Sequence, residues 1–260
     1  GATGIFAKDK DKFGDWSDQD ANSKFFSLVT GLFGSYVGYS WTWKDLAAPW
    51  SYTTHPYRNK SNYSDMVYLN KIVALTDMKA TYAHELQHNV HGVADADEET
   101  WVNEGCSMYA EEINGLGSFS ISRFAEIPLG ETAPRAAKTS LTRFTMGDVW
   151  NRFGICPRCE RDSTGVSDSE GRRIWSSHYQ NVSIWTHYLD VNVSHQSGKT
   201  IKTMVSDAAN GVAGVNILST TPILQNPDGP FVKWTVANYA NQVNSNPADT
   251  DYNYTGGWAA

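Results

Sequence analysis

The sequence predicts a single α+β domain in which strands come early in the chain and helices come late. Three observations predict this fold class. The chain has 260 residues, 40% hydrophobic and 19% charged, which is enough for one large domain with a buried core. Residues 25–58 alternate aromatic residues with Gly, Ser and Thr, as strands and turns do, and several later segments have helical periodicity. We therefore expect a strand-rich subdomain over residues 1–92 and a mainly helical one over residues 93–260.

The strand-rich part ends in a helix. Residues 1–24 are rich in Asp and Lys and are expected to be irregular. Asp65–Asn70 is predicted to be a short strand that follows a turn. Met78–His91 is predicted to be a helix closed by Gly92 at its C′ position.

The later elements are predicted to be helical. A second helix is expected to begin at or just inside the acidic run Asp95–Glu99, whose charges suit the helix dipole. It continues through Thr100–Ile113 to a stop at Asn114-Gly115. Three further segments have helical character: Ser176–Val191, Thr200–Ala209 and Phe231–Val243.

Composition narrows the classes of function. Asp and Glu outnumber Lys and Arg by 28 to 21, and the net charge of −7 argues against a nucleic-acid partner. No stretch reaches the roughly 18 consecutive apolar residues that a membrane span needs. The 10 Trp and 13 Tyr suggest an aromatic groove of the kind that binds sugars. The richness in Asn, Ser and Thr and the absence of a signal-peptide pattern indicate a processed, secreted chain, which we expect to be a monomer.

The cysteines have no clear metal or redox pattern. Cys156 and Cys159 form a CxxC in a loop-like segment, with neither a βαβ context nor two further zinc ligands nearby. A local disulfide and two free thiols both remain open. Cys106 is expected to be a small, buried apolar residue.

Residues 84–88 form an HExxH motif within the first predicted helix. Histidines four residues apart lie on one helix face, so His84 and His88 can both reach one metal ion at about 2.0–2.1 Å. Glu85 would lie close to that ion but point away from it, and could deprotonate a water molecule that the ion binds. The alternative is a polar helix face with two surface histidines. Apolar neighbours such as Leu86 and Val90 argue against it, because they predict a partly buried helix.

A third ligand decides the kind of metal site. The pattern HExxHxxGxxH fails, because residue 91 is His and residue 94 is Ala. Glu104 in the second predicted helix fits instead, since the intervening residues suffice for a loop and an antiparallel return. Gly105 removes a side chain where two helices must approach. Two His, one Glu and an open position form a catalytic zinc site rather than a closed structural one.

The remaining polar residues near the motif receive other roles. Glu98 and Glu99 are expected in the first turn of the second helix, where they stabilise its dipole. Glu111 and Glu112 are expected to be solvated. His91 is expected to be a cation at the helix C-terminus or a support for a ligand, rather than a ligand.

A Ca²⁺ site near the N-terminus is a weaker possibility. The segment from Asp9 to Asp20 places acidic or polar residues with the spacing of a calcium loop, but Phe13 occupies a liganding position. The alternative is a solvated acidic terminus.

These motifs resemble a known family. HELQH followed by W-x-N-E-G-x-x-x-Y-A-E resembles the gluzincin metallopeptidases, and TYAHELQH with ETWVNEG is most similar to the hyicolysin-type secreted neutral metalloproteases. The resemblance covers residues 60–113 well and residues 176–243 loosely. It implies a zincin-like fold with the active-site cleft between two subdomains, Zn²⁺ on His84, His88 and Glu104, Glu85 as general base, and a peptide substrate. One departure is Met108, which stands where thermolysin-like relatives have an Asp that orients the first His.

Peptide hydrolysis also needs a donor for the oxyanion. The segment HYQNVSIWTHYL resembles the gluzincin region in which a helix-opening Tyr has that role, which implies Tyr179, with His178 as the alternative. His187 and Tyr188 are expected to pack. Asp65–Asn70 is expected to be the edge strand along which an extended peptide lies antiparallel.

The sequence therefore predicts a single-domain, secreted zinc endopeptidase. A zinc aminopeptidase is one alternative, although the GxMEN-like amine-binding motif of such enzymes is absent. A non-catalytic module that binds glycan or protein in an aromatic groove is the other.

Overall fold

The computed structural model describes residues 4–16, 18, 20–32, 37–40, 62, 64–116, 140–142 and 168–243, with the backbone alone for 168–177 and 239–243. These residues form many helices and one small sheet, in agreement with the predicted α+β class. A π-helical segment, Leu189–Val193, and a 3₁₀ turn, Ser194–Gln196, follow the helix Asp168–Tyr188. In chain order the strands and α-helices are α1 (Ile5–Phe13), β1 (Phe26–Thr30), β2 (Gly38–Tyr39), β3 (Met66–Asn70), α3 (Leu75–Ala94), α4 (Thr100–Ile113), α7 (Asp168–Tyr188), α8 (Ile201–Val205), α9 (Gly211–Asn216) and α10 (Pro230–Val243).

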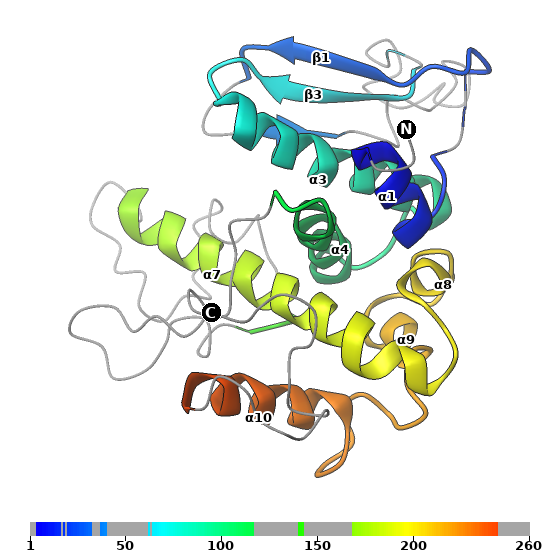
Figure 1. Cartoon of the computed structure of the whole chain (residues 1–260), viewed down its shortest axis with the longest axis vertical. Helices are drawn as coiled ribbons and strands as arrows, with labels where there is room; N and C mark the ends of the chain where they lie inside the picture. The colour runs from blue at the N-terminus through cyan, green and yellow to red at the C-terminus, as the bar shows by residue number, and fades with distance from the viewer. Residues whose placement is uncertain are drawn as a thin grey trace, which may run out of the picture.

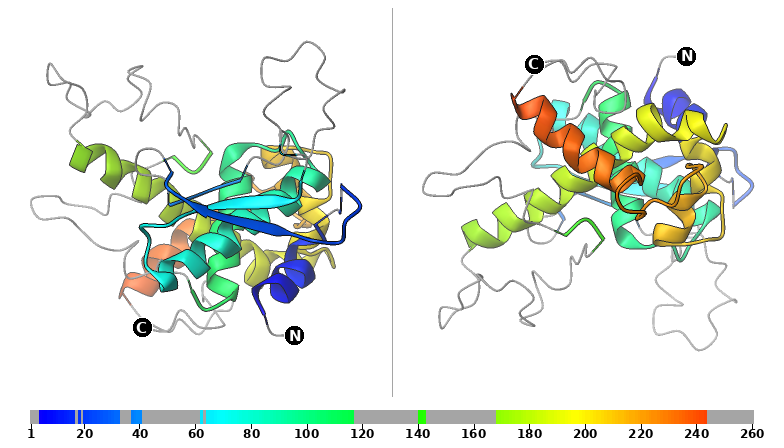
Figure 2. Two further views of the ribbon diagram at one scale, coloured as in Figure 1. Left: turned by 90° about the horizontal axis from the view of Figure 1, so that it is seen from above. Right: turned by 90° about the horizontal axis from the view of Figure 1, so that it is seen from below.

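The elements are stacked in layers from the sheet to α10. Figure 1 shows β1 and β3 above α3, α4 between α3 and α7, and α10 on the far side of α7. Seen from below in Figure 2, α10 crosses α7, and the rings of Trp185 and Trp234 lie 5.2 Å apart between these helices. Helix α4 therefore has neighbours on two sides, which explains why nine of its residues are buried. No described helix combines the length and the apolar character that a membrane crossing requires.

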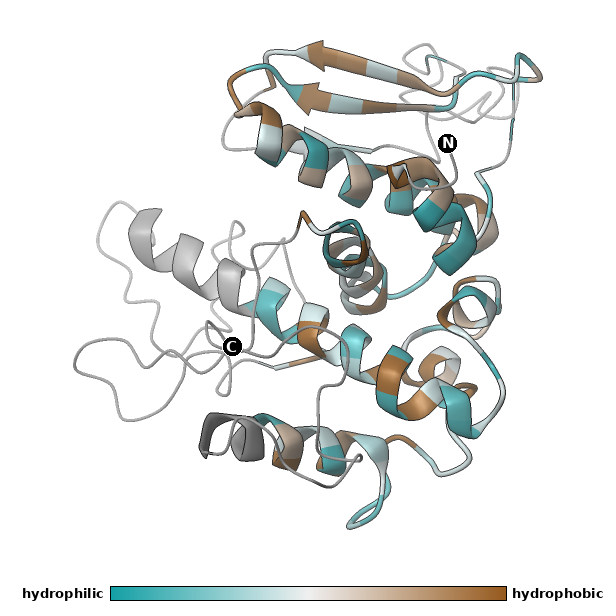
Figure 3. Ribbon diagram, viewed as in Figure 1, coloured by the Kyte–Doolittle hydropathy of each residue, from teal (hydrophilic) through white to brown (hydrophobic). Residues whose placement is uncertain are grey.

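The sheet has the strand order β1-β3-β2. Strand β1 runs parallel to β3, and β2 runs antiparallel to it. Apolar residues make up most of β1 and β3, as Figure 3 shows, and Val67 in β3 is completely buried. The prediction that Asp65–Asn70 is an edge strand is therefore wrong. Strand β3 pairs with β1 along its whole length and with β2 at Tyr68 and Leu69, so it is the central strand of the described sheet, and β2 is the edge next to α3.

The structure corrects the expectation that residues 1–24 are irregular. Residues 5–13 form α1, which packs on the core through Phe13. Polar contacts also attach it: Lys12 Nζ lies 2.7 Å from Asp190 Oδ2, and Lys8 Nζ donates to the carbonyl of Ile113. These contacts join residues distant in sequence, so the local composition could not indicate them.

Other element boundaries differ from those predicted. Helix α3 does not end at Gly92 but continues to Ala94, and the N–H of Asp95 bonds to the carbonyl of His91. Helix α4 begins at Thr100, after the acidic run in which its start was predicted, but it ends where predicted, at Ile113, and Gly115 after it has a φ of +69°, as expected of a helix stop. The helix over Ser176–Val191 begins earlier, at Asp168. The helix over Thr200–Ala209 is reduced to α8, where the side chain of Thr200 caps the first turn.

Candidate metal centre

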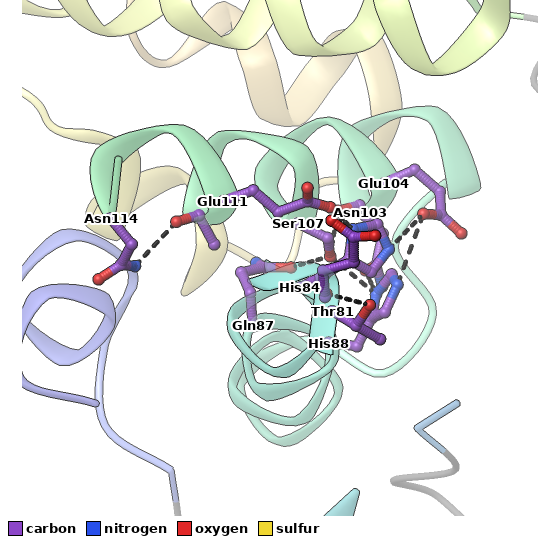
Figure 4. A network of polar contacts seen from close by, with 11 residues as sticks. Thr81, His84, Gln87, His88, Asn103, Glu104, Ser107, Glu111 and Asn114 are labelled. Carbon is purple, nitrogen blue, oxygen red and sulfur yellow. Dashed lines mark hydrogen bonds and ion pairs between the residues drawn. The ribbon is translucent and has the colours of Figure 1, made fainter. Parts of the chain in front are cut away.

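Helices α3 and α4 bring together the three residues predicted to bind zinc. His84 and His88 lie one turn apart on α3, and Glu104 lies in the early part of the facing α4 (Figure 4). Glu104 Oε2 is 3.2 Å from His84 Nε2 and 3.5 Å from His88 Nε2. Among the described residues these three form a group whose potential ligand atoms all lie within 4.8 Å of one another.

The donor set fits a divalent metal ion. Two imidazole nitrogens and one carboxylate oxygen are the ligands of a catalytic zinc site, which leaves one position for water or substrate. Glu104 Oε2 is buried, and the polar groups nearest to it among the described residues are the Nε2 atoms of the two histidines.

The charges of the three groups depend on one another. Burial by itself raises the pKa of Glu104, but the attraction of His88 and His84 outweighs burial and leaves it well below its ordinary value. Burial lowers the pKa of His84, but its contacts with Glu104 and Glu111 raise it well above the ordinary value. Protons and a metal ion therefore compete for the same imidazole nitrogens, and metal binding should weaken as the pH falls.

Both histidines are oriented through their other ring nitrogen. His84 Nδ1 lies 2.9 Å from Glu111 Oε1, and His88 Nδ1 lies 2.5 Å from Asn103 Oδ1. Ser107 Oγ is also 3.0 Å from His88 Nδ1. An acceptor at Nδ1 keeps the proton there and leaves Nε2 free to bind a metal.

The expectation that Glu111 and Glu112 are solvated is wrong. Their side chains are only 13% and 22% exposed, and Glu112 Oε1 lies 2.5 Å from His187 Nδ1. Glu111 provides the support for His84 that Met108 cannot give. Glu111 follows Glu104 by seven positions, so the two carboxylates lie two turns apart on one face of α4. This spacing is the feature of the sequence that could have placed Glu111 near the metal ligands. The contacts of Asn103 and Ser107 with His88 could not be predicted, because they depend on the register of α4 against α3.

Glu85 is placed next to the metal ligands but outside the ligand group. Its side chain is buried, and burial raises its pKa. Strand β2 lies directly against it, because a Cβ on Gly38 would come within 2.8 Å of Glu85 Oε1 and 2.1 Å of Thr81 Cγ2. Only glycine fits at position 38.

Tyr179 of α7 reaches this region from the opposite side. Its ring centroid is 6.1 Å from that of His84. It does not open the helix, since α7 begins at Asp168. His178, the alternative donor, is instead associated with the backbone of Ser140, and burial lowers its pKa. The geometry thus brings Tyr179, rather than His178, to the histidine pair.

Gly105 permits a close approach of α4, but to α7. A Cβ at this position would lie 2.5 Å from Thr186 Oγ1 and 3.1 Å from the carbonyl oxygen of Val182. As expected, His187 and Tyr188 pack in the interior: the ring of Tyr188 stacks on Trp185, and His187 contacts Tyr109.

His91 is neither a metal ligand nor a helix-terminal cation. It is fully buried, and burial lowers its pKa to about 3, so the imidazole is neutral. Glu98 and Glu99 also differ from expectation, because no acid lies in the first turn of α4. Glu98 instead accepts from the N–H of Gly211, and Glu99 from the indole N–H of Trp101.

Asp9, the first position of the possible calcium loop near the N-terminus, does not lie in a loop. Asp9 lies inside α1, fully buried, and accepts a hydrogen bond of 2.7 Å from Asn114 Nδ2. A helical backbone cannot wrap its side chains around an ion as a loop does. A second acidic group, Asp18, Asp20 and Asp65, has carboxylate oxygens within 4.8 Å of one another, but backbone N–H groups of Asn22 and Ser23 already donate to two of them.

Of the cysteines, the structure describes Cys106 alone. It is a free, buried thiol, as expected, and burial raises its pKa. Cys156 and Cys159 lie outside the described residues, as do most of the aromatic residues between 36 and 57.

Comparison with known proteins adds no family assignment. No protein-family model matches the sequence, and no curated protein matches it significantly.

Proposed function

We propose that this protein is a secreted, zincin-like zinc endopeptidase whose ligands are His84, His88 and Glu104. The observation that carries the proposal is the convergence of both Nε2 atoms on Glu104 Oε2, with each Nδ1 engaged by an acceptor. Surface histidines that bind no metal would be expected to have neither the shared carboxylate at Nε2 nor the acceptor at Nδ1. No contact among the described residues favours the alternative, a non-catalytic module that binds glycan or protein in an aromatic groove.

A zinc ion held by these residues would act as a Lewis acid, which polarises the scissile carbonyl and lowers the pKa of a water molecule. Glu85 is the proposed general base. Its carboxylate takes the proton from the attacking water and then gives it to the leaving amine. Burial raises the pKa of Glu85, which makes its carboxylate a better proton acceptor than an exposed glutamate.

Tyr179 is the proposed donor to the oxyanion. Its position beside His84 lets the phenol O–H stabilise the negative charge that develops on the carbonyl oxygen. The proposed peptide lies along the edge of β2, whose residue Gly38 is in contact with Glu85. An extended peptide would then add a strand to the sheet next to the base.

The test combines a peptide-library digest with metal analysis. Wild-type protein should contain zinc at one equivalent and cleave peptides within the chain, and a chelator should abolish cleavage, as read by mass spectrometry. Glu85→Gln should retain the zinc but lose about 10²–10⁴-fold in kcat. Glu112→Gln is the matched control, because this carboxylate bonds to His187 instead, and it should retain activity. Full activity of Glu85→Gln would refute the proposal, and release of single N-terminal residues would identify an aminopeptidase.

A further inference from the structure

The connection between α3 and α4 gathers carboxylates that the proposed metal centre does not use. Asp95 and Asp97 lie in this connection, and Asp207, which follows α8, is close enough to act on the charge of Asp95. Asp95 is only 8% exposed, and its Oδ2 is buried and accepts no hydrogen bond from the described residues. A buried carboxylate oxygen normally has a donor, so this one indicates that a positively charged group belongs beside it.

The charges around Asp95 are all of one sign. Burial raises the pKa of Asp95, and the side chains of Asp97 and Asp207 raise it further, whereas the backbone N–H of Asp97 opposes them. None of the ion pairs among the described residues involves these three acids. Carboxylates that approach one another in this way repel, and the repulsion is relieved when a proton or a metal ion lies between them.

A buried amide oxygen lies beside the same connection. Asn210, just before α9, donates from Nδ2 to the carbonyl oxygen of Asp97 at 2.9 Å. Since a carbonyl oxygen can only accept, this contact determines which end of the amide is the oxygen. Asn210 Oδ1 is buried, and it also accepts no hydrogen bond from the described residues. Asp95 and Asn210 therefore each bring a buried acceptor oxygen to this place, without a donor from the part of the chain that the structure describes.

Oxygen ligands of this kind select a hard cation. Carboxylates, amide oxygens and backbone carbonyls are the ligands of Ca²⁺, which takes about six to eight oxygens in irregular geometry and uses water for the remainder. Mg²⁺ requires a nearly regular octahedron, and structural zinc sites use imidazole and thiolate ligands. The side chain of Asp97 is exposed, so water can complete the coordination of an ion here.

We propose that Asp95, Asp97 and Asn210 Oδ1 bind one Ca²⁺ ion, close to the negative charge of Asp207. The ion would join the connection between the two helices of the metal centre to the segment between α8 and α9. It would thereby stabilise the pairing of α3 with α4. This inference does not depend on the proposed peptidase activity, and its test does not require zinc.

Calorimetric titration of the full chain, freed of calcium, with Ca²⁺ tests the site. Wild type should bind Ca²⁺ with a Kd of about 10⁻⁵–10⁻³ M, and saturating Ca²⁺ should raise its Tm. Asp95→Asn and Asp97→Asn should each weaken the affinity at least about 10-fold, because the charge of the ligands sets it. The variant with both changes should show no rise in Tm. Asp77→Asn, an exposed acid in the first turn of α3, is the matched control and should bind as wild type does.

Circular dichroism without Ca²⁺ checks that each variant folds. Removal of a repelling charge should leave Asp95→Asn no less stable than wild type, and if it does not fold, the exposed Asp97→Asn decides. Unchanged Ca²⁺ affinity in the folded variants would overturn the proposal. Loss of affinity in Asp20→Asn alone would also overturn it, because the ion would then lie at the other acidic group. A wild type that neither binds Ca²⁺ nor gains in Tm would show that Asp95 and Asp97 share a proton instead.

Discussion

Replacing Asp9 by asparagine should stabilise the protein at neutral and alkaline pH. Asp9 is fully buried in α1, where burial raises its pKa from the ordinary 3.8 to about 7, although Asn114 and Lys8 oppose the shift. Its Oδ2 has no hydrogen-bond partner among the described residues. The folded protein therefore holds a carboxyl group that is costly to ionise.

The size of the effect follows from the two pKa values. Well below pH 3.8 the carboxyl is protonated in both states and carries no penalty. Between 3.8 and about 7 the unfolded chain releases this proton while the folded chain keeps it, so the free energy of unfolding falls as the pH rises. At about 1.4 kcal/mol per pKa unit, the total loss is about 4 kcal/mol. An asparagine at position 9 keeps the acceptor for Asn114 but buries an unpaired NH₂, which costs about 1–3 kcal/mol. The net gain at pH 8 is about 2 kcal/mol.

Urea unfolding of both proteins, followed by tryptophan fluorescence from pH 4 to pH 8 with chelator present, measures this directly. The difference between Asp9→Asn and wild type removes the contribution of all other titrating groups. It should change by about 4 kcal/mol over this range, in favour of the variant as the pH rises. Asp11→Asn, an exposed position of the same helix, is the control. A difference that does not vary with pH would refute the reasoning.

Three further predictions concern the metal centre and its support. Glu111→Gln should weaken zinc binding about 10–100-fold by chelator competition, because the charged partner of His84 Nδ1 is lost; unchanged affinity would contradict its role. Tyr179→Phe should lower kcat by about 10²–10³-fold with zinc affinity unchanged, and a wild-type kcat would exclude it as the oxyanion donor. Gly105→Ala should cost about 1–3 kcal/mol in urea unfolding, since the new methyl group meets Thr186 Oγ1. Adding Thr186→Ala should recover part of that loss, and full additivity of the two changes would contradict the proposed clash.

The sequence was informative where local spacing determines the geometry. The four-residue spacing of His84 and His88 and the apolar stripe of α3 depend on one helix, and the C-terminal end of α4 follows from the Asn114-Gly115 pair after it. Glu104 could be predicted as the third ligand on the assumption that the second helix runs antiparallel to the first.

The errors arose where distant contacts prevail over local composition. Glu111 is charged and near a helix end, which suggests solvent exposure, yet the packing of α4 between α3 and α7 places it on His84. Residues 5–13 contain five charged side chains, but α1 is held by Ile113 and Asp190, far along the chain. The internal position of β3 likewise depended on strand pairing that no single segment reveals.

The proposed metal ligands all come from one helical hairpin, α3 and α4, whereas Tyr179 comes from α7. During synthesis the hairpin emerges from the ribosome well before α7, and the short connection between its helices makes its closure fast and inexpensive in entropy. On the proposed function, metal capture would precede completion of the chain, while Tyr179, the proposed oxyanion donor, would arrive later. A nascent chain that already held its ion would then lack that donor, and this order of synthesis would protect the unfinished polypeptide from the proposed activity.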